Sequence, residues 1–173
     1  MLDISKLESG NVELNPEEFD LTDAISVTIE RYGKFTEKDG YSISFEPNGC
    51  KVFVNSDKTL FLQALYNLLC NAITHTGKDK KITVTQTVIF SDDQKPENVR
   101  ISVNDTGEGI SKEDLPLIWD RYYKVDKTHK RDSVGTGLGL SIVKKVMNLL
   151  DGSCGVESTV GVGSSFWLEL KID

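Results

Sequence analysis

The chain has 173 residues, of which 27% are charged and 38% hydrophobic, and its formal net charge is −7. These values predict one folded domain, exclude intrinsic disorder, and disfavour nucleic acid as a partner of the surface as a whole. The three cysteines lack disulfide or zinc spacing, which fits a reducing compartment. No apolar run approaches the roughly 20 residues that span a bilayer. We therefore expect a soluble chain, which can still be part of a membrane protein.

The N-terminal third of the chain predicts the end of a helix, a full helix and short strands. Residues 1–9 are typical of the last turns of a helix, which Gly10 ends. Further on, Thr22 or Asp23 is expected to cap a helix that ends near Lys38. Strands are expected at Phe19–Leu21, Tyr41–Glu46 and Lys51–Val54, with the last two paired as a hairpin.

The rest of the chain predicts two helices, two strand pairs and an irregular segment. Asp57 or Ser56 begins a helix that continues to about His75. Ser111 begins a short helix, and the residues after it up to Val134 show no regular pattern. Long irregular segments in a compact domain are commonly functional lids. The remaining helix and strands are expected at Leu138–Leu150, Ile82–Phe90, Val99–Asp105, Ser153–Ser158 and Ser164–Ile172.

Together these elements predict an α/β (α+β) fold built as a two-layer sandwich. We expect a mixed, mainly antiparallel sheet of about five strands, covered on one face by about three helices. In the helix that ends near His75, a stripe is expected to pack on the sheet. Its members are Leu62, Leu65, Leu69 and Ile73.

The stretch Asn-Asp-Thr-Gly-Glu-Gly-Ile, residues 104–110, ends an apolar strand with a carboxylate and two glycines. Val99, Ile101 and Val103 share one face of this strand, and position 105 continues the same alternation. We therefore expect the Asp105 carboxylate to be directed toward the core. An unpaired charge there costs several kcal/mol, so the carboxylate needs donors.

Two kinds of donor are open for Asp105. The carboxylate can cap its own turn by accepting from the backbone N–H of Gly107 or Glu108. Alternatively, Gly107 and Gly109 leave the backbone accessible to a flat ligand, and an exocyclic amine such as that of adenine is the donor. This stretch alone supports both alternatives equally.

A second group of polar residues lies on the helix that ends near His75. Asn67, Asn71 and His75 are four residues apart and share the side opposite to the apolar stripe. They form either a plain solvent-facing surface or a ligand site. Asparagine is a poor helix former, and an amide oxygen is a suitable ligand for Mg²⁺ beside phosphate oxygens.

A third feature is the run Val-Gly-Thr-Gly-Leu-Gly-Leu-Ser, residues 134–141, which leads into a helix. Glycine-rich backbone at a helix N-terminus presents free N–H donors that suit phosphate. The G-x-G-x-G spacing excludes the dinucleotide-binding fingerprint, and no P-loop is present. A run of basic residues precedes this glycine-rich segment, and composition alone predicts that the run is a solvated loop. Its members are Lys124, Lys127, His129, Lys130 and Arg131.

In this order, the three features resemble the ATP-binding domain of bacterial sensor histidine kinases, a branch of the Bergerat-fold ATPases. The resemblance covers nearly the whole chain. The opening residues 2–10 resemble the end of the dimerising helical hairpin that precedes this domain in the family. The matching motifs are the N box at 67–75, the first glycine box at 105–109, the F box at 117–123, the second glycine box at 135–139 and a final glycine turn at 161–166.

The resemblance implies a site for ATP and Mg²⁺. Asp105 would hydrogen-bond the adenine amine, Asn71 would coordinate Mg²⁺, and Asn67 would lie near the phosphates. Residues 115–134 would be a mobile ATP lid, whose basic run then serves the triphosphate. The implied catalytic residues are Asn67 and Lys124, and the implied nucleotide-binding residues are Asn71, His75, Asp105, Gly107, Gly109, Ile110, Tyr123, Thr136, Gly137, Leu138, Gly139, Leu140 and Ser165.

The chain departs from the family pattern at a few positions. Thr74 stands where a lysine or arginine is common, and Lys124 where arginine is common, which replaces a bidentate fork with a point charge. We hypothesise that Lys124 partly substitutes for the cation missing at Thr74. Trp119 and the pair Tyr122–Tyr123 replace the more usual phenylalanines, and we expect their packing to survive.

The resemblance also implies partners outside this chain. Neither His75 nor His129 has the acceptor context of the family, so the phosphoacceptor is expected on the upstream hairpin of a homodimer. Residues 1–14 would be the end of that hairpin and a linker, and residues 15–173 the ATP-binding domain. A response regulator receiver domain would be the next partner. We expect a cytoplasmic location, with any membrane contact made by other parts of the parent protein.

Two other functions stay open. ATP-hydrolysing relatives of the gyrase, chaperone or mismatch-repair type carry a glutamate base where this chain has Asn67, which cannot accept a proton at neutral pH. That difference favours phosphoryl transfer to a protein over hydrolysis. The other alternative is a non-catalytic, nucleotide-sensing interaction module, which the presence of Asp105, Asn71 and the glycine run disfavours.

Overall fold

The computed structural model describes residues 12–123 and 137–172. The helix end predicted at residues 1–9 lies outside the described residues. So do Lys124, Thr136 and the basic run, together with the second half of the predicted lid. Within the described ranges, no helix is long and apolar enough to cross a membrane.

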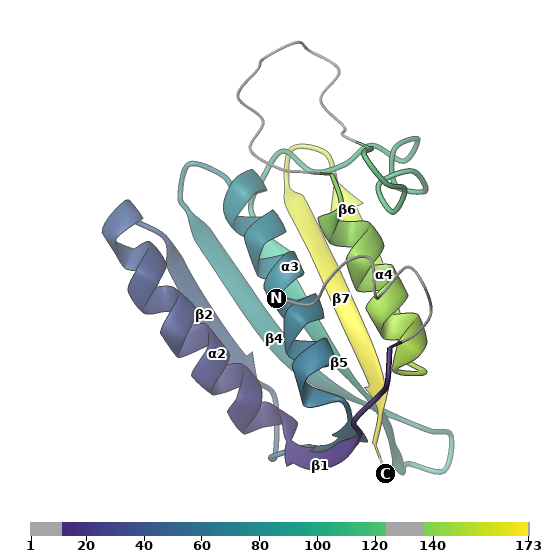
Figure 1. Ribbon diagram of the computed structural model, residues 1–173. Helices are drawn as coiled ribbons and strands as arrows, with labels where there is room; N and C mark the ends of the chain where they lie inside the picture. The colour runs from purple at the N-terminus through teal and green to yellow at the C-terminus, as the bar shows by residue number, and fades with distance from the viewer. Residues whose placement is uncertain (1–11, 124–136, 173) are drawn as a thin grey trace.

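A five-stranded sheet forms one layer, and three helices lie across one of its faces (Figure 1). The strand order is β2-β4-β5-β7-β6, with β2 and β4 parallel and the other neighbours antiparallel. The predicted two-layer sandwich is therefore confirmed. The sheet comprises β2 Ser42–Pro47, β4 Lys81–Phe90, β5 Pro96–Asp105, β6 Ser153–Thr159 and β7 Gly163–Lys171, and the helices are α2 Leu21–Thr36, α3 Lys58–His75 and α4 Gly139–Leu149.

The core lies between α3 and the central strands. On β5, Val99, Ile101 and Val103 are buried, whereas the alternate residues face the other side of the sheet. The predicted stripe on α3 is partly wrong, because Leu62 and Ile73 are only half-buried. The helix packs on β5 and also contacts its neighbours α2 and α4, so its apolar face is wider than one stripe. The buried residues of α3 are Leu60, Phe61, Ala64, Leu65, Leu68, Leu69 and Ala72.

One predicted strand pairing is wrong. The segment expected to form a hairpin with β2 is instead β3, Phe53–Ser56, which pairs antiparallel with β1, Glu17–Asp20. β2 takes β4 as its partner, in parallel. The connection between β2 and β3 contacts the start of α2, where Leu21 N–H donates to Val52 O at 2.9 Å.

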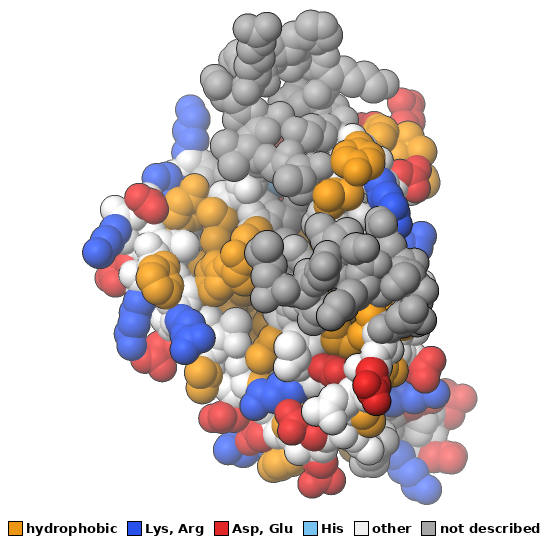
Figure 2. All heavy atoms as spheres, viewed as in Figure 1, with side chains coloured by type: hydrophobic (Ala, Val, Ile, Leu, Met, Phe, Trp, Pro, Cys, Tyr) orange, Lys and Arg blue, Asp and Glu red, His pale blue; other side chains and the backbone are white. Residues whose placement is uncertain are grey.

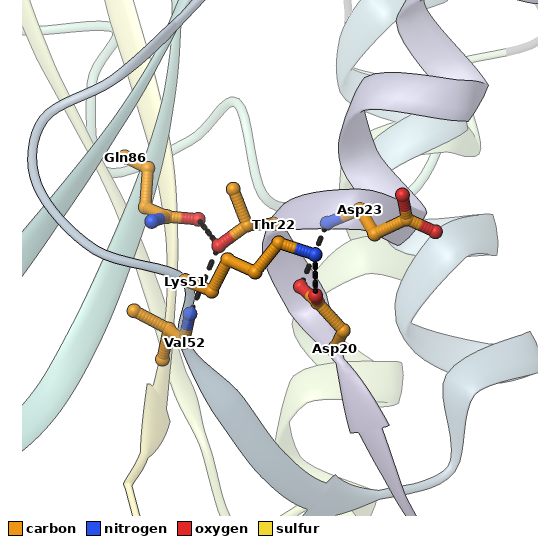
Figure 3. Close-up of polar contacts among 6 residues, drawn as sticks. All are labelled: Asp20, Thr22, Asp23, Lys51, Val52 and Gln86. Atoms are coloured by element: carbon orange, nitrogen blue, oxygen red, sulfur yellow. Dashed lines mark hydrogen bonds and ion pairs between the residues drawn. The ribbon is translucent and has the colours of Figure 1, made fainter.

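A polar junction holds this corner together (Figure 3). The Thr22 hydroxyl accepts from Val52 N–H and donates to Oε1 of the buried Gln86 on β4, both at 3.0 Å. Nearby, Lys51 Nζ lies 2.9 Å from Asp20 Oδ2. Thr22 therefore joins α2 to β4. The predicted capping role is taken by Asp20, whose Oδ1 accepts from Asp23 N–H at 2.9 Å.

The predicted boundaries of α3 depend on local signals, and they agree with the structure. Asp57 caps α3 by accepting from Leu60 N–H, and α3 ends at His75, with Thr76 as its C-cap. The short helix predicted after Ser111 is absent from the described residues. Instead, Ser111 Oγ caps a series of turns by accepting from Asp114 N–H at 3.2 Å.

The outer surface of the helical layer is partly apolar. Figure 2 shows hydrophobic side chains gathered between α2 and α3. There, Tyr32 and the partly exposed Tyr66 contact edge to face, with 5.2 Å between ring centroids. On α2, Val27 and Phe35 are exposed as well. Exposed apolar residues of this kind are common on folded domains and do not define a site by themselves.

Candidate nucleotide-binding site

Asp105, the last residue of β5, is a buried acid with few donors. Its side chain is 8% exposed, as the predicted inward orientation requires, and Oδ1 accepts from Gly107 N–H at 2.8 Å. The turn-capping alternative is therefore confirmed for one oxygen. Burial raises the pKa of Asp105 above its ordinary value, and the N–H groups of Gly107 and Ser164 and the nearby His75 oppose this change. The carboxylate is thus left short of stabilising donors.

The turn after Asp105 is confined on two sides. A Cβ atom at position 107 would overlap the carbonyl oxygen of His75, at the end of α3. A Cβ atom at position 109 would overlap the carbonyl oxygen of Thr159, and Gly109 has a φ of +74°. Only glycine fits at these positions, so the turn lies directly between α3 and the β6–β7 hairpin.

The β6–β7 hairpin is joined to this turn by hydrogen bonds. Ile110 N–H donates to Ser158 Oγ at 2.8 Å, and Gly161 N–H donates to Glu108 O at 2.7 Å. Ser158 was not identified from the sequence, because a serine within a strand carries no signal of its partner. These bonds fix the backbone that follows Asp105.

The strand register corrects one predicted site residue. Ser164 of β7 pairs directly with Asp105, whereas Ser165 pairs with Asn104. Ser164 is buried on the core side, and Ser165 therefore faces the opposite side of the sheet from Asp105. We replace Ser165 with Ser164 in the candidate site. A shift of one residue along a strand moves each side chain to the other face of the sheet. The sequence alone did not determine how β7 is aligned with β5.

The polar side of α3 meets the start of α4. Asn67 and Asn71 are half-buried and His75 is exposed. A Cβ atom at Gly139, the first residue of α4, would lie 3.8 Å from Asn67 Oδ1. Among the described residues no side chain caps α4, so the N–H groups of its first turn, those of Gly139 and Leu140 included, suit an anion.

The segment after Ile110 packs its aromatic residues onto this end of the sheet. Trp119 contacts Phe166 edge to face, with 6.2 Å between ring centroids. The Tyr123 hydroxyl donates to Asp114 Oδ1 at 2.5 Å, a bond that raises the pKa of Tyr123. Tyr122 N–H donates to Gly137 O at 2.9 Å, which brings together the residues on either side of segment 124–136.

The residues present fit Mg²⁺ only together with a ligand. Among the described residues, no group of three or more His, Cys, Asp or Glu side chains forms a metal site. The Asn71 side-chain amide makes no hydrogen bond within the described ranges. A half-buried amide oxygen with no partner among residues 12–123 and 137–172 suits Mg²⁺, which takes few protein ligands beside phosphate oxygens and water.

The candidate site thus comprises the buried Asp105 with its glycine turn at one end of α3 and the first turn of α4 beside Asn67. Residues 56–173 match the family model described as histidine kinase-, DNA gyrase B-, and HSP90-like ATPase. The match covers more than half of the chain, and the chain therefore belongs to this family. Its relatives and structural neighbours are sensor histidine kinases and their catalytic domains.

Two curated relatives illustrate the similarity. Sensor protein GacS of Pseudomonas syringae pv. syringae is 32% identical over 173 residues, covering 99% of this chain and 19% of the relative. The autoinducer 2 sensor kinase/phosphatase LuxQ of Vibrio cholerae is 33% identical over 176 residues, covering 100% of this chain and 20% of LuxQ. The chain spans 19% and 20% of the lengths of these relatives.

Solved structures agree with the fold. The nucleotide-free catalytic domain of histidine kinase ThkA superposes with a TM-score of 0.75 at 28% identity, covering 91% of this chain and 96% of that domain. ThkA in complex with the response regulator protein TrrA gives a TM-score of 0.77 at 25% identity, covering 98% of this chain and 46% of ThkA. The described chain therefore has the architecture of a histidine kinase catalytic domain.

Proposed function

We propose that this chain is the ATP-binding catalytic domain of a sensor histidine kinase. It binds ATP with Mg²⁺ and presents the γ-phosphate to a histidine on an upstream helical hairpin. The observation that carries this proposal is the buried Asp105, whose pKa is raised by burial and whose carboxylate has few donors among the described residues. Membership of the ATPase family independently supports ATP as the ligand.

On the base side, the Asp105 carboxylate accepts a hydrogen bond from the exocyclic amine of adenine. This donor offsets the cost of burying the charge, which the Gly107 N–H meets only in part. Gly109 and Ile110 line the base, and their position is held by Ser158 and Thr159 of the hairpin. Ser164 supports Asp105 from the neighbouring strand.

On the phosphate side, the first turn of α4 supplies backbone N–H donors and the positive end of a helix dipole. Asn67 orients a phosphate oxygen beside Gly139, and the Asn71 amide oxygen is the protein ligand for Mg²⁺. When bound, Mg²⁺ neutralises charge that develops on the phosphates during transfer. The remaining contacts in this proposal are Gly137, Leu138, Leu140, His75 and Tyr123, together with Lys124 and Thr136 outside the described residues.

The proposed partners follow from the same assignment. Residues 1–14 are the end of the dimerisation hairpin and a linker, and residues 15–173 are the catalytic domain. A response regulator receiver domain takes the phosphoryl group next, in the cytoplasm. Support comes from relatives that are sensor kinases and from the ThkA complex with a response regulator. Asn67 at the position of the hydrolytic glutamate further favours transfer over hydrolysis.

Calorimetric titration with ATP, with and without Mg²⁺, tests the binding step. We expect saturable binding that Mg²⁺ strengthens. No binding at millimolar ATP contradicts the proposal and favours a non-catalytic module that docks a partner through its surface.

Incubation with γ-labelled ATP tests the location of the phosphoacceptor. We expect no phosphohistidine on this chain, because the acceptor lies on the hairpin. An acid-labile, base-stable phosphoryl group on His75 or His129 contradicts this part of the proposal.

A further inference from the structure

Thr106, the residue directly after Asp105, is held by side chains from the segment between α3 and β4. Its hydroxyl donates to Asp79 Oδ1 at 2.5 Å, and this hydrogen bond lowers the pKa of Asp79. Its backbone N–H donates to Thr76 Oγ1 at 3.5 Å. The Thr76 hydroxyl in turn donates to Lys81 O at 2.8 Å. The turn that carries Asp105 is therefore tied to both ends of the α3–β4 connection.

The backbone leaves little room for movement at this contact. A Cβ atom at Gly77 would lie 2.5 Å from Thr106 O, so the two loops are in direct contact. The connection itself is a tight turn, in which Lys80 N–H donates to Gly77 O at 2.9 Å and Lys80 has a φ of +51°. Asp79 thus lies in a tight turn that is in direct contact with the turn after Asp105.

The contact contributes little to the core. Asp79 and Thr106 are both exposed, and neither packs among the buried apolar residues. An exposed hydrogen bond contributes little to global stability, since water competes for both partners. The contact does, however, act on the residue that links Asp105 to Gly107.

We propose that Asp79 is a positioning residue that, through Thr106, aligns the Asp105 carboxylate for selection of adenine. The inference rests on the proposed ATP-binding function and extends it to base specificity. Adenine donates its exocyclic amine to Asp105, whereas hypoxanthine presents a carbonyl oxygen at that position and meets the carboxylate unfavourably. The ratio of ITP to ATP dissociation constants therefore reports the alignment of Asp105.

The test compares ATP and ITP affinities by competition against a fluorescent ATP analogue. We expect Asp79→Ala to raise the Kd for ATP about fivefold, the effect of one typical hydrogen bond, with a much smaller change for ITP. The ITP-to-ATP ratio therefore falls. Asp79→Asn retains an acceptor oxygen and stays near wild type. Asp93→Ala, a matched exposed acid in the β4–β5 loop, changes neither affinity.

A second pair of variants tests the same contact from its other side. Thr106→Val removes the hydroxyl with little change of shape and should reproduce the effect of Asp79→Ala, whereas Thr106→Ser should bind as wild type. In an Asp105→Asn background, Asp79→Ala should add less than about a twofold change, because the two residues act through one interaction. Thermal unfolding of each variant monitors the fold.

The outcomes separate the inference from the proposed function. An unchanged ITP-to-ATP ratio in Asp79→Ala, or equal loss of both affinities, overturns the positioning role while ATP binding stands. Full additivity with Asp105→Asn also overturns it. Absence of binding of either nucleotide by the wild-type chain contradicts the proposed function itself.

Discussion

Two buried acids, Asp57 and Asp105, lie at opposite ends of α3 and differ in how they are stabilised. Each is 8% exposed. Both oxygens of Asp57 accept backbone N–H groups at 3.0 Å, from Leu60 and from Asn15. For Asp105, by contrast, Gly107 supplies the one hydrogen bond of good geometry among the described residues, and burial raises its pKa.

Asp20 extends the comparison at the end of the molecule where α2 begins. It caps α2 through Asp23 N–H and pairs with Lys51 (Figure 3), and these partners lower its pKa. The chain itself therefore supplies partners for both oxygens of Asp20 and Asp57, whereas Asp105 has a hydrogen bond of good geometry at one oxygen among the described residues. A buried acid that the fold leaves incompletely paired is a candidate for ligand binding. The following variants test this distinction, from the largest expected effect to the smallest.

Gly107→Ala should have the largest effect, because its Cβ would overlap the carbonyl oxygen of His75. We expect the free energy of unfolding to fall by about 3 kcal/mol and ATP binding to be lost. Urea denaturation measures the first effect and titration the second. The control is Gly33→Ala within α2, where nothing lies within 4 Å and alanine should stabilise by about 0.5 kcal/mol. Equal behaviour of the two variants would show that the turn is not confined.

Asp105→Asn should raise the Kd for ATP about 30-fold without lowering the stability of the ligand-free chain. The neutral amide retains an acceptor for Gly107 N–H but presents hydrogens where adenine also donates. Titration and thermal unfolding measure the two effects. Loss of stability comparable to that of a structural acid would remove the distinction between Asp105 and Asp57.

The same variant carries a pH signature. The folded pKa of Asp105 lies above its ordinary value of 3.8, so ionisation destabilises the ligand-free chain at higher pH. This penalty disappears as the pH falls through the raised pKa toward the ordinary value. Relative to Asp105→Asn, the wild-type chain should therefore gain stability on acidification over that interval. Parallel stability curves for the two proteins would contradict the raised pKa.

Asp57→Ala removes a structural acid of equal burial. We expect a loss of about 1.5 kcal/mol in the free energy of unfolding, since the α3 cap and the Asn15 contact are both lost. ATP affinity should change less than about twofold, because one cap at the far end of α3 does not touch the site. Asp57→Ser, which retains a capping oxygen, should recover most of the stability. A selective loss of ATP affinity would indicate that Asp57, like Asp105, contributes to ligand binding.

Lys51→Ala should have the smallest effect. The Lys51 side chain is 69% exposed, so its pair with Asp20 is expected to add only slightly to stability at low salt and less at high salt. The contribution is present above the ordinary pKa of Asp20 and is lost as the pH falls through its lower folded value. Denaturation at two salt concentrations measures it, and a salt-independent effect would point to packing of the lysine stem instead.

Elements with strong local signals were predictable from the sequence. Asp57 marked the start of α3, and the helix expected at Leu138–Leu150 agrees within one residue at each end with α4, Gly139–Leu149. Alternation along β5 predicted the inward orientation of Asp105. These features follow from hydrogen bonding and side-chain spacing within a few residues of chain.

Features that depend on distant pairing were not predictable in the same way. The partner of β3 was misassigned, and Ser165 was chosen in place of Ser164, because pairing and register depend on the other strand. The contact between Asp79 and Thr106 joins residues 27 positions apart and has no sequence signal. Each of these features is a contact between segments rather than the structure of one segment.

The sequence by itself determined that an acid at position 105 is directed inward beside glycines, since period-two alternation and local turn chemistry require only neighbouring residues. The tertiary structure decided which groups surround that acid. The end of α3, the β6–β7 hairpin and Ser164 reach it only after the sheet has closed, because burial and pairing of a charge depend on segments that are distant along the chain.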